Sequence, residues 1–156
     1  MMQTNITGKI ITTGLLGIFC LAAHASLFNV VQISETYDDV LENVKDTIIG
    51  RGLNISNVLS ASEMLNRTGH DLGYDKNVFK HAHTVEFCSA TLSHQLVSIN
   101  PNNMVLCPFT ISIYQLSEDT DKVYVTYRTP EAGKESAEVI EKVDQLIKSI
   151  VQEATE

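Results

Sequence analysis

The chain has no tryptophan, and only three of its 156 residues are proline. It contains no proline-rich, low-complexity or periodic stretch, so it does not resemble a disordered or repeat protein. Hydrophobic residues make up 44% of the chain, which is enough to bury one ordinary core. A chain of this length is expected to form one domain rather than two.

Basic residues are scarce relative to acidic ones. The chain holds 11 lysines and arginines against 19 aspartates and glutamates, a formal net charge of -8 at pH 7. A surface with this balance repels phosphate backbones and anionic membranes, so nucleic-acid binding is disfavoured. The acidity also suits a well-solvated exported protein, and this simpler explanation needs no functional role.

Short catalytic and metal-binding motifs are also missing. The sequence contains no C-x-x-C, no H-x-x-x-H and no C-x-x-C-H. No Ser-His-Asp order, phosphate loop or paired-carboxylate signature stands out. The adjacent Asp38 and Asp39 are best explained as favourable charge at the start of a helix. We therefore expect a protein that binds rather than one that catalyses.

The first 25 residues have the pattern of a secretory signal peptide. Lys9 supplies the positive charge, residues 10–22 are apolar apart from two threonines, and Ala23-His24-Ala25 forms an A-x-A cleavage site. An apolar run of that length rises only about 20 Å as a helix, short of the roughly 30 Å of a bilayer core. We expect cleavage after Ala25, a periplasmic location and no remaining membrane span. A single domain is then expected over residues 26–156.

The rest of the chain alternates strand and helix patterns. Strands are expected at 27–33, 53–59, 84–89, within 104–116 and at 122–129, and helices at 36–48, 60–65, 91–99 and 135–153. Residues 68–83 are expected to form a long surface loop. In the second strand, Leu53, Ile55 and Leu59 alternate and are expected on one side. The order β-α-β-α-β-α-β-β-α predicts an α+β two-layer sandwich: a mostly antiparallel sheet with helices on one face and a long C-terminal helix.

Cys88 and Cys107 are the two cysteines expected to remain after processing. In an oxidising compartment the default interpretation is a disulfide between them. It would close a loop of about 20 residues and stabilise the fold by roughly 3 kcal/mol in the chain-entropy model. Alternatively, Cys88 is a reactive thiol, because a position just before a helix favours the thiolate.

A third interpretation of the cysteines is a soft-metal or haem-iron site. His94 lies on the first turn of the expected helix after Cys88, and His83 precedes Cys88 on the adjoining strand. Cys88, His94, Cys107 and His83 would form the ligand set. Alternatively, His94 is a solvent-exposed helix residue without a ligand role. His81 and His83 are likewise expected to be solvent-exposed histidines of a loop.

Two tyrosines are candidates for a ligand groove. Tyr114 and Tyr124 fall on the alternate positions of the last two expected strands, opposite the apolar set. They are therefore expected on the wetter side of the sheet, where they pack its surface or line a groove for a small ligand.

Several stretches within residues 28–128 have a familiar pattern, including TYDDVLENVKDTIIGRGLNI and KVYVTYR. The most specific parts are Phe87-Cys88, the Asn100-Pro101 helix stop, and Cys107-Pro108-Phe109 leading into Ile113-Tyr114. Together they resemble a bacterial family catalogued as domain of unknown function 302, and most of all its exported proteobacterial branch. The resemblance implies a small α+β fold and a homodimer. It implies no agreed activity, and the exported branch occurs in bacteria with respiratory or sulfur chemistry.

Three functions follow from these residues. The leading hypothesis is a non-enzymatic periplasmic binding or accessory protein that carries a metal, haem or small ligand near Cys88, His94 and Cys107. The second is a thiol-dependent redox or sulfur-handling enzyme that uses Cys88. The third is a structural or interaction module in which the Cys88–Cys107 disulfide only stabilises the fold.

Overall fold

The computed structural model describes residues 28–156, so the predicted signal peptide and its cleavage site lie outside the described residues. The strands are β1 (Phe28–Ile33), β2 (Asn54–Ser60), β3 (Phe79–Cys88), β4 (Phe109–Leu116) and β5 (Val123–Arg128). The α-helices are α1 (Tyr37–Gly50), α2 (Ala61–Gly69), α3 (Ala90–Ile99) and α4 (Ala137–Ala154). None of the helices within residues 28–156 combines the length and apolarity needed to cross a bilayer.

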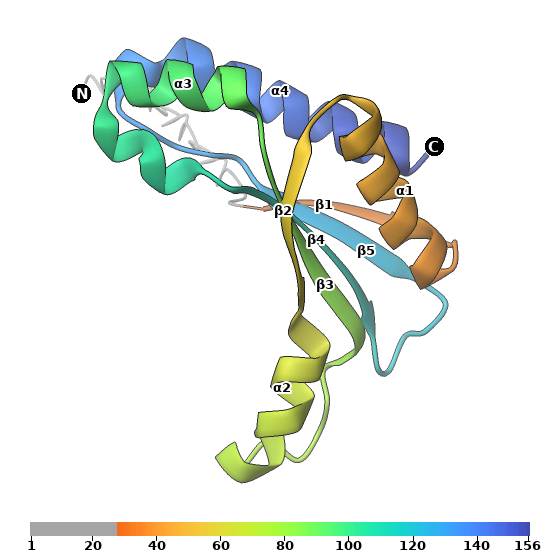
Figure 1. The fold of residues 1–156 in the computed structure, drawn as a ribbon. Helices are drawn as coiled ribbons and strands as arrows, with labels where there is room; N and C mark the ends of the chain where they lie inside the picture. Colours follow the sequence, from red (N-terminus) through yellow and green to blue (C-terminus); the bar gives the residue numbers. More distant parts are fainter. Residues whose placement is uncertain (1–27) are drawn as a thin grey trace, which may run out of the picture.

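The five strands form one sheet in the order β1-β5-β4-β3-β2, and every neighbouring pair is antiparallel. Helices α1, α3 and α4 gather on one side of this sheet, while α2 extends beyond the ends of β2 and β3 (Figure 1). The predicted α+β architecture, with its antiparallel sheet and long C-terminal helix, is therefore confirmed. The prediction that all helices cover one face needs one correction, because α2 projects from the end of the sheet.

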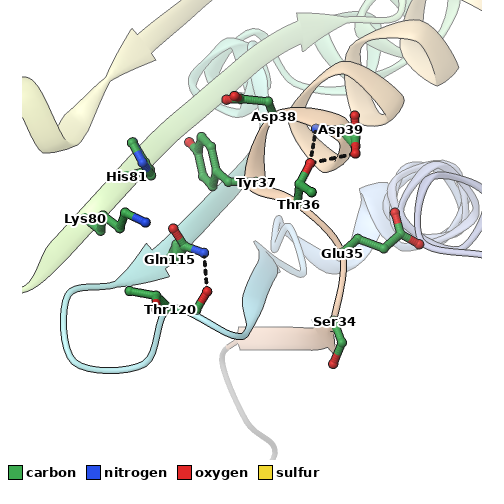
Figure 2. Close-up of a pocket in the computed structure, with 10 residues that line it drawn as sticks. All are labelled: Ser34, Glu35, Thr36, Tyr37, Asp38, Asp39, Lys80, His81, Gln115 and Thr120. Atoms are coloured by element: carbon green, nitrogen blue, oxygen red, sulfur yellow. Dashed lines mark hydrogen bonds between the residues drawn. The ribbon is translucent and has the colours of Figure 1, made fainter.

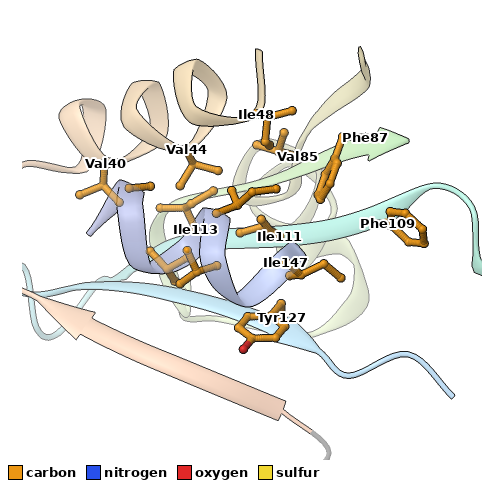
Figure 3. Packing of buried hydrophobic residues seen from close by; sticks show 14 of the residues in the cluster. Val40, Val44, Ile48, Val85, Phe87, Phe109, Ile111, Ile113, Tyr127 and Ile147 are labelled. Atoms are coloured by element: carbon orange, nitrogen blue, oxygen red, sulfur yellow. The ribbon is translucent and has the colours of Figure 1, made fainter. Parts of the chain in front are cut away.

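The core lies between the sheet and the helices α1 and α4. On β3 and β4, alternate residues such as Val85, Phe87 and Ile113 are fully buried, because successive side chains of a strand point to opposite faces. On α1, Val40, Val44 and Ile48 repeat every four residues and present one apolar stripe to the strands (Figure 3). On α4 the buried stripe is Val139, Val143, Ile147, Ile150, Val151 and Ala154. Each fully buried aliphatic side chain contributes about 1.5–3 kcal/mol of transfer free energy.

Side-chain caps determine where two of these helices begin. Thr36 Oγ1 accepts a hydrogen bond from the backbone N–H of Asp39 at 3.3 Å and donates one to Asp39 Oδ2 at 2.6 Å. The first of these bonds satisfies a backbone donor at the start of α1. Ser89 Oγ accepts from the backbone N–H of Leu92 at 3.4 Å and caps α3 directly after Cys88.

The prediction that Ile55 and Leu59 of β2 lie on the same side of the sheet was wrong. A β-bulge between Ile55 and Asn57 shifts the register of β2 against β3, so that Val58 pairs with Val85 and Leu59 with Thr84. Since a shift of one residue reverses every following side chain, Val58 joins Ile55 on the helix-covered side and Leu59 lies on the opposite side. Plain alternation along the sequence cannot detect a bulge.

The prediction of a loop through His83 was also wrong. Strand β3 already begins at Phe79 and pairs with β4, with His81 opposite Gln115 and His83 opposite Ile113. The polar composition of this segment resembles a loop, but the backbone hydrogen bonds to β4 hold it extended. His81 and His83 are therefore placed by a strand rather than by a loop.

The side of the sheet opposite the helices is called the open face below. It is formed by the residues that alternate with the buried ones, and in β3, β4 and β5 most of them are half-buried. Its members on the five strands include Phe28, Val30, Gln32, Asn57, Leu59, Ala82, Thr84, Glu86, Thr110, Ser112, Tyr114, Leu116, Tyr124, Thr126 and Arg128. The open face thus mixes hydroxyl-bearing, aromatic, aliphatic and charged side chains and is not continuously apolar.

Candidate functional site

Cys88 and Cys107 are joined by a disulfide, with their Cα atoms 6.3 Å apart. Cys88 ends β3, and Cys107 lies between the turn Pro101–Leu106 and β4. Both cysteines are half-buried, and the Ser93 hydroxyl of α3 donates a hydrogen bond to Cys107 Sγ at 3.6 Å. In this state neither sulfur is a free thiol.

The other predicted ligands do not join the two cysteines. His94 is exposed on α3 and lines a groove with Glu138 and Lys142 of α4. His83 alternates onto the helix-covered side of β3, near the middle of the strand. Within residues 28–156, no group of three or more His, Cys, Asp or Glu side chains is arranged to hold a metal ion.

His83 belongs instead to an aromatic cluster with Tyr37 and His81. The Tyr37 hydroxyl lies 2.6 Å from His83 Nδ1 and also donates towards the carbonyl oxygen of Ile113 at 3.4 Å. The His81 ring stacks on the Tyr37 ring, with centroids 5.0 Å apart and planes at 28°. Tyr37 is the first residue of α1, so the Thr36 cap positions its ring over β3.

Burial raises the pKa of the Tyr37 phenol well above its usual value, and the negative charge of Asp38 raises it further. Tyr37 therefore keeps its proton throughout the neutral range and remains a hydrogen-bond donor. The hydroxyl held in this way orients His83 and the Ile113 carbonyl. Tyr37 was missed at the sequence level, where its only signal was an aromatic residue directly after a helix cap.

A pocket of about 730 Å³ opens beside this cluster (Figure 2). Its lining comes from the β1–α1 connection, the start of α1, strand β3 and the β4–β5 hairpin: Ser34, Glu35, Thr36, Tyr37, Asp38, Asp39, Lys80, His81, Gln115 and Thr120. Gln115 is buried and donates from Nε2 to the carbonyl oxygen of Thr120 at 2.8 Å, which fixes that wall. The volume of the pocket falls within the range typical of small-molecule sites.

Three carboxylates and one amine line this pocket, so its charge is predominantly negative. Glu35, Asp38, Asp39 and Lys80 are all exposed. Tyr37 and His81 add flat ring surface beside them. Such a lining offers hydrogen-bond acceptors, an aromatic wall and an attraction for positive charge.

The two groove candidates lie together on the open face. The rings of Tyr114 and Tyr124 stack with centroids 5.0 Å apart and planes at 9°. Phe79 meets Tyr114 edge-on at 5.4 Å, and burial raises the pKa of the Tyr114 phenol. These contacts hold the pair against the sheet, on the side away from the pocket beside Tyr37.

The architecture is that of a small α+β domain with an antiparallel sheet covered on one side by helices. The sequence profile of the family described as "Domain of unknown function DUF302" matches residues 29–154, and the chain belongs to that family. A solved structure described as an uncharacterized conserved DUF302 protein from Bacillus stearothermophilus is similar at a TM-score of 0.70. The similarity covers 83% of this chain and 99% of that one, at 13% identity, and shows the shared fold. No curated protein matches the sequence.

Proposed function

We propose that this protein is a non-enzymatic binding or accessory protein that holds a small, positively charged ligand in the pocket beside Tyr37. The observation that carries the proposal is the pocket of about 730 Å³ lined by Tyr37, His81 and three carboxylates. An amine or guanidinium group would be attracted by the carboxylates of the lining and would pack on the Tyr37–His81 pair. This choice moves the ligand away from the cysteines, where the sequence hypothesis had put it.

The state of the cysteines supports this change of site. A metal or haem ligand set at Cys88 and Cys107 requires thiolates, and a thiol enzyme requires a free Cys88. With the two sulfurs bonded to each other, the disulfide instead favours the structural hypothesis for this end of the molecule. A stabilised interaction module is therefore the second candidate function, and it is compatible with ligand binding elsewhere.

The proposal includes export to the periplasm, membership of the exported proteobacterial branch and assembly as a homodimer. Export rests on the signal-like residues 1–25, and the branch and the dimer rest on the resemblance. A disulfide also persists best in an oxidising compartment. The intact mass of the protein purified after export tests signal cleavage and the disulfide. It should equal the mass of a chain that begins at Ser26, less about two hydrogens for the disulfide. A chain that retains its first 25 residues would contradict the export proposal.

Ligand binding is tested by calorimetric titration with three molecules of similar size: arginine, glutamine and glutamate. Arginine is expected to bind, glutamine to bind more weakly and glutamate not to bind, because carboxylates outnumber amines in the pocket lining. Asp38→Asn should weaken arginine binding about threefold to tenfold, as expected for a charge exposed to solvent.

Asp46→Asn is the matched control for Asp38→Asn. Asp46 is also an exposed aspartate of α1, but it does not line the pocket, so its loss changes the net charge equally. Arginine affinity should then change less than twofold. Equal losses in both variants, or equal binding of arginine and glutamate, would show that the pocket does not select a cation.

A further inference from the structure

The open face presents exposed and half-buried side chains from all five strands, and no helix among residues 28–156 packs over it in Figure 1. Val30 on β1 is 54% exposed, and Leu59 on β2 is 41% exposed. These two residues are at opposite edges, since β1 and β2 are the edge strands. Antiparallel sheets commonly leave one face to water, so exposure alone does not define a binding surface.

The three hydroxyl groups in the row between these two residues, those of Thr84, Ser112 and Thr126, have hydrogen-bond partners within the chain. Thr84 and Ser112 pair across β3 and β4 at 2.8 Å, and Thr126 Oγ1 donates to the carbonyl oxygen of Asn29 at 2.9 Å. The main cost of burying a polar group comes from leaving it without a partner. Removing water from this middle row therefore costs little, and the open face can be covered by a protein surface.

Charge is arranged symmetrically about the middle strand. Glu86 on β3 pairs with Thr110 on β4. On the other side of β4, Ser112 pairs with Thr126 of β5. The same register, continued by two residues, puts Arg128 beside Thr110. Within residues 28–156, neither Glu86 nor Arg128 takes part in an ion pair. One unpaired charge of each sign thus flanks β4 in the same row.

A two-fold axis running along β4 makes this arrangement self-complementary. Because the sheet order is β1-β5-β4-β3-β2, such an axis lays β3 of one copy over β5 of the other, and β2 over β1. Glu86 of each copy then faces Arg128 of the other copy, and Leu59 of each copy faces Val30 of the other copy, so that each contact occurs twice in the dimer. Opposite charges and apolar edges meet at the same time.

We infer that the open face is a homodimer interface, in which two copies pack face to face about a two-fold axis along β4. This inference rests on the homodimer included in the proposed function and specifies its surface. It does not depend on the ligand pocket, which is lined by the start of α1, His81 and the β4–β5 hairpin. Face-to-face sheets pack about 10 Å apart, which leaves room for the side chains of both open faces.

The dimensions of the face predict a weak and reversible dimer. Five strands at about 4.8 Å spacing span roughly 24 Å, and six residues at about 3.3 Å each span roughly 20 Å. The flat area is therefore on the order of 500 Å² per copy, or about 1,000 Å² in total, which is at the lower limit for a specific interface. A membrane is a poor alternative occupant, because the face carries hydroxyls and charges and the chain has a net charge of -8.

Sedimentation velocity of the purified protein tests the interface over about 1–300 µM. We expect a monomer–dimer equilibrium in this range, as for other small interfaces. Arg128→Glu and Glu86→Arg should each weaken the dimer at least tenfold, because each creates two like-charge contacts per dimer. The double variant Glu86→Arg/Arg128→Glu restores both pairs and should return the affinity to within about threefold of the original. Lys148→Glu, which reverses an exposed charge on α4, should leave the dimer unchanged.

A chain that stays monomeric at about 300 µM, or a double variant no tighter than the single ones, would overturn the inference. Far-UV circular dichroism and thermal unfolding show whether each variant is folded. If a charge reversal unfolds the protein, Arg128→Gln and Glu86→Gln replace it, with a loss of at least threefold expected in each. Arginine titration of the Arg128→Glu monomer separates the two proposals, since the pocket should still bind when the dimer is lost.

Discussion

Strand β3 ends in two different ways, and the difference separates structural residues from candidate ligand-binding residues. At its C-terminal end, Cys88 is bonded to Cys107, and Ser89 caps α3 directly afterwards. In its N-terminal half, His81 and His83 meet Tyr37 through a ring stack and a 2.6 Å hydrogen bond, beside an open pocket. The cysteine end is closed by a covalent bond, whereas the histidine end is accessible to a ligand.

This comparison changes how the chemistry-bearing residues are understood. The sequence drew attention to the cysteine end, because cysteines in a chain that is expected to be exported suggest either a disulfide or a reactive site. In the structure that end stabilises the strand–helix–strand unit and carries no free thiol. The polar segment that resembled a loop contains two of the three residues of the aromatic cluster.

The largest effect should come from removing the covalent bond. The variant Cys88→Ala/Cys107→Ala should lose about 3 kcal/mol of unfolding free energy, since the bond closes a loop of about 20 residues. Urea unfolding measures this loss. Arginine binding at the pocket should change less than twofold while the protein stays folded. A loss of binding above tenfold in folded protein would show that the two ends are not independent.

A smaller effect is expected from Tyr37→Phe at the other end. Removing the hydroxyl takes the hydrogen-bond partner from His83 Nδ1, which should cost about 1–2 kcal/mol and weaken arginine binding. The exposed Tyr74→Phe is the matched control and should be nearly neutral. If Tyr37→Phe is as neutral as Tyr74→Phe, the cluster does not hold this end together.

The same variant should change how stability depends on alkaline pH. The fold raises the pKa of Tyr37, so its contribution is complete below pH 10, the ordinary tyrosine value. Above pH 10 the unfolded chain loses this proton first, and unfolding free energy falls by up to about 1.4 kcal/mol per pH unit. Tyr37→Phe should therefore show a shallower decline than the original protein. Chemical unfolding at several pH values between about 9 and 11.5 tests this, and equal slopes would contradict it.

The smallest effect should come from Ser93→Ala at the cysteine end. Its hydroxyl contacts Cys107 Sγ at 3.6 Å, and hydrogen bonds to sulfur are weak. Relative to the exposed helix control Ser98→Ala, unfolding free energy should differ by less than about 0.5 kcal/mol. A larger difference, measured by thermal unfolding, would mean that this contact adds substantially to the disulfide.

Much of the fold follows from periodicity in the sequence. The four-residue repeat of Val40, Val44 and Ile48 and the two-residue alternation of the β4–β5 hairpin each specify a buried face, because those spacings match a helix turn and a strand pleat. Thr36 and the glycines after Ile48 mark the ends of α1 for equally local reasons. The bulge in β2 and the early start of β3 depend on pairing with distant strands and could not be inferred locally.

The candidate site shows the same division. The sequence by itself determined the residue chemistry: Cys88 and Cys107, the alternating pair His81 and His83, and an acidic excess. Only the tertiary structure placed Tyr37 against His81 and His83, because these residues lie more than forty positions apart and meet when α1 packs on β3. Local patterns carry information about nearest neighbours along the chain, whereas a pocket is formed by side chains that folding alone brings together.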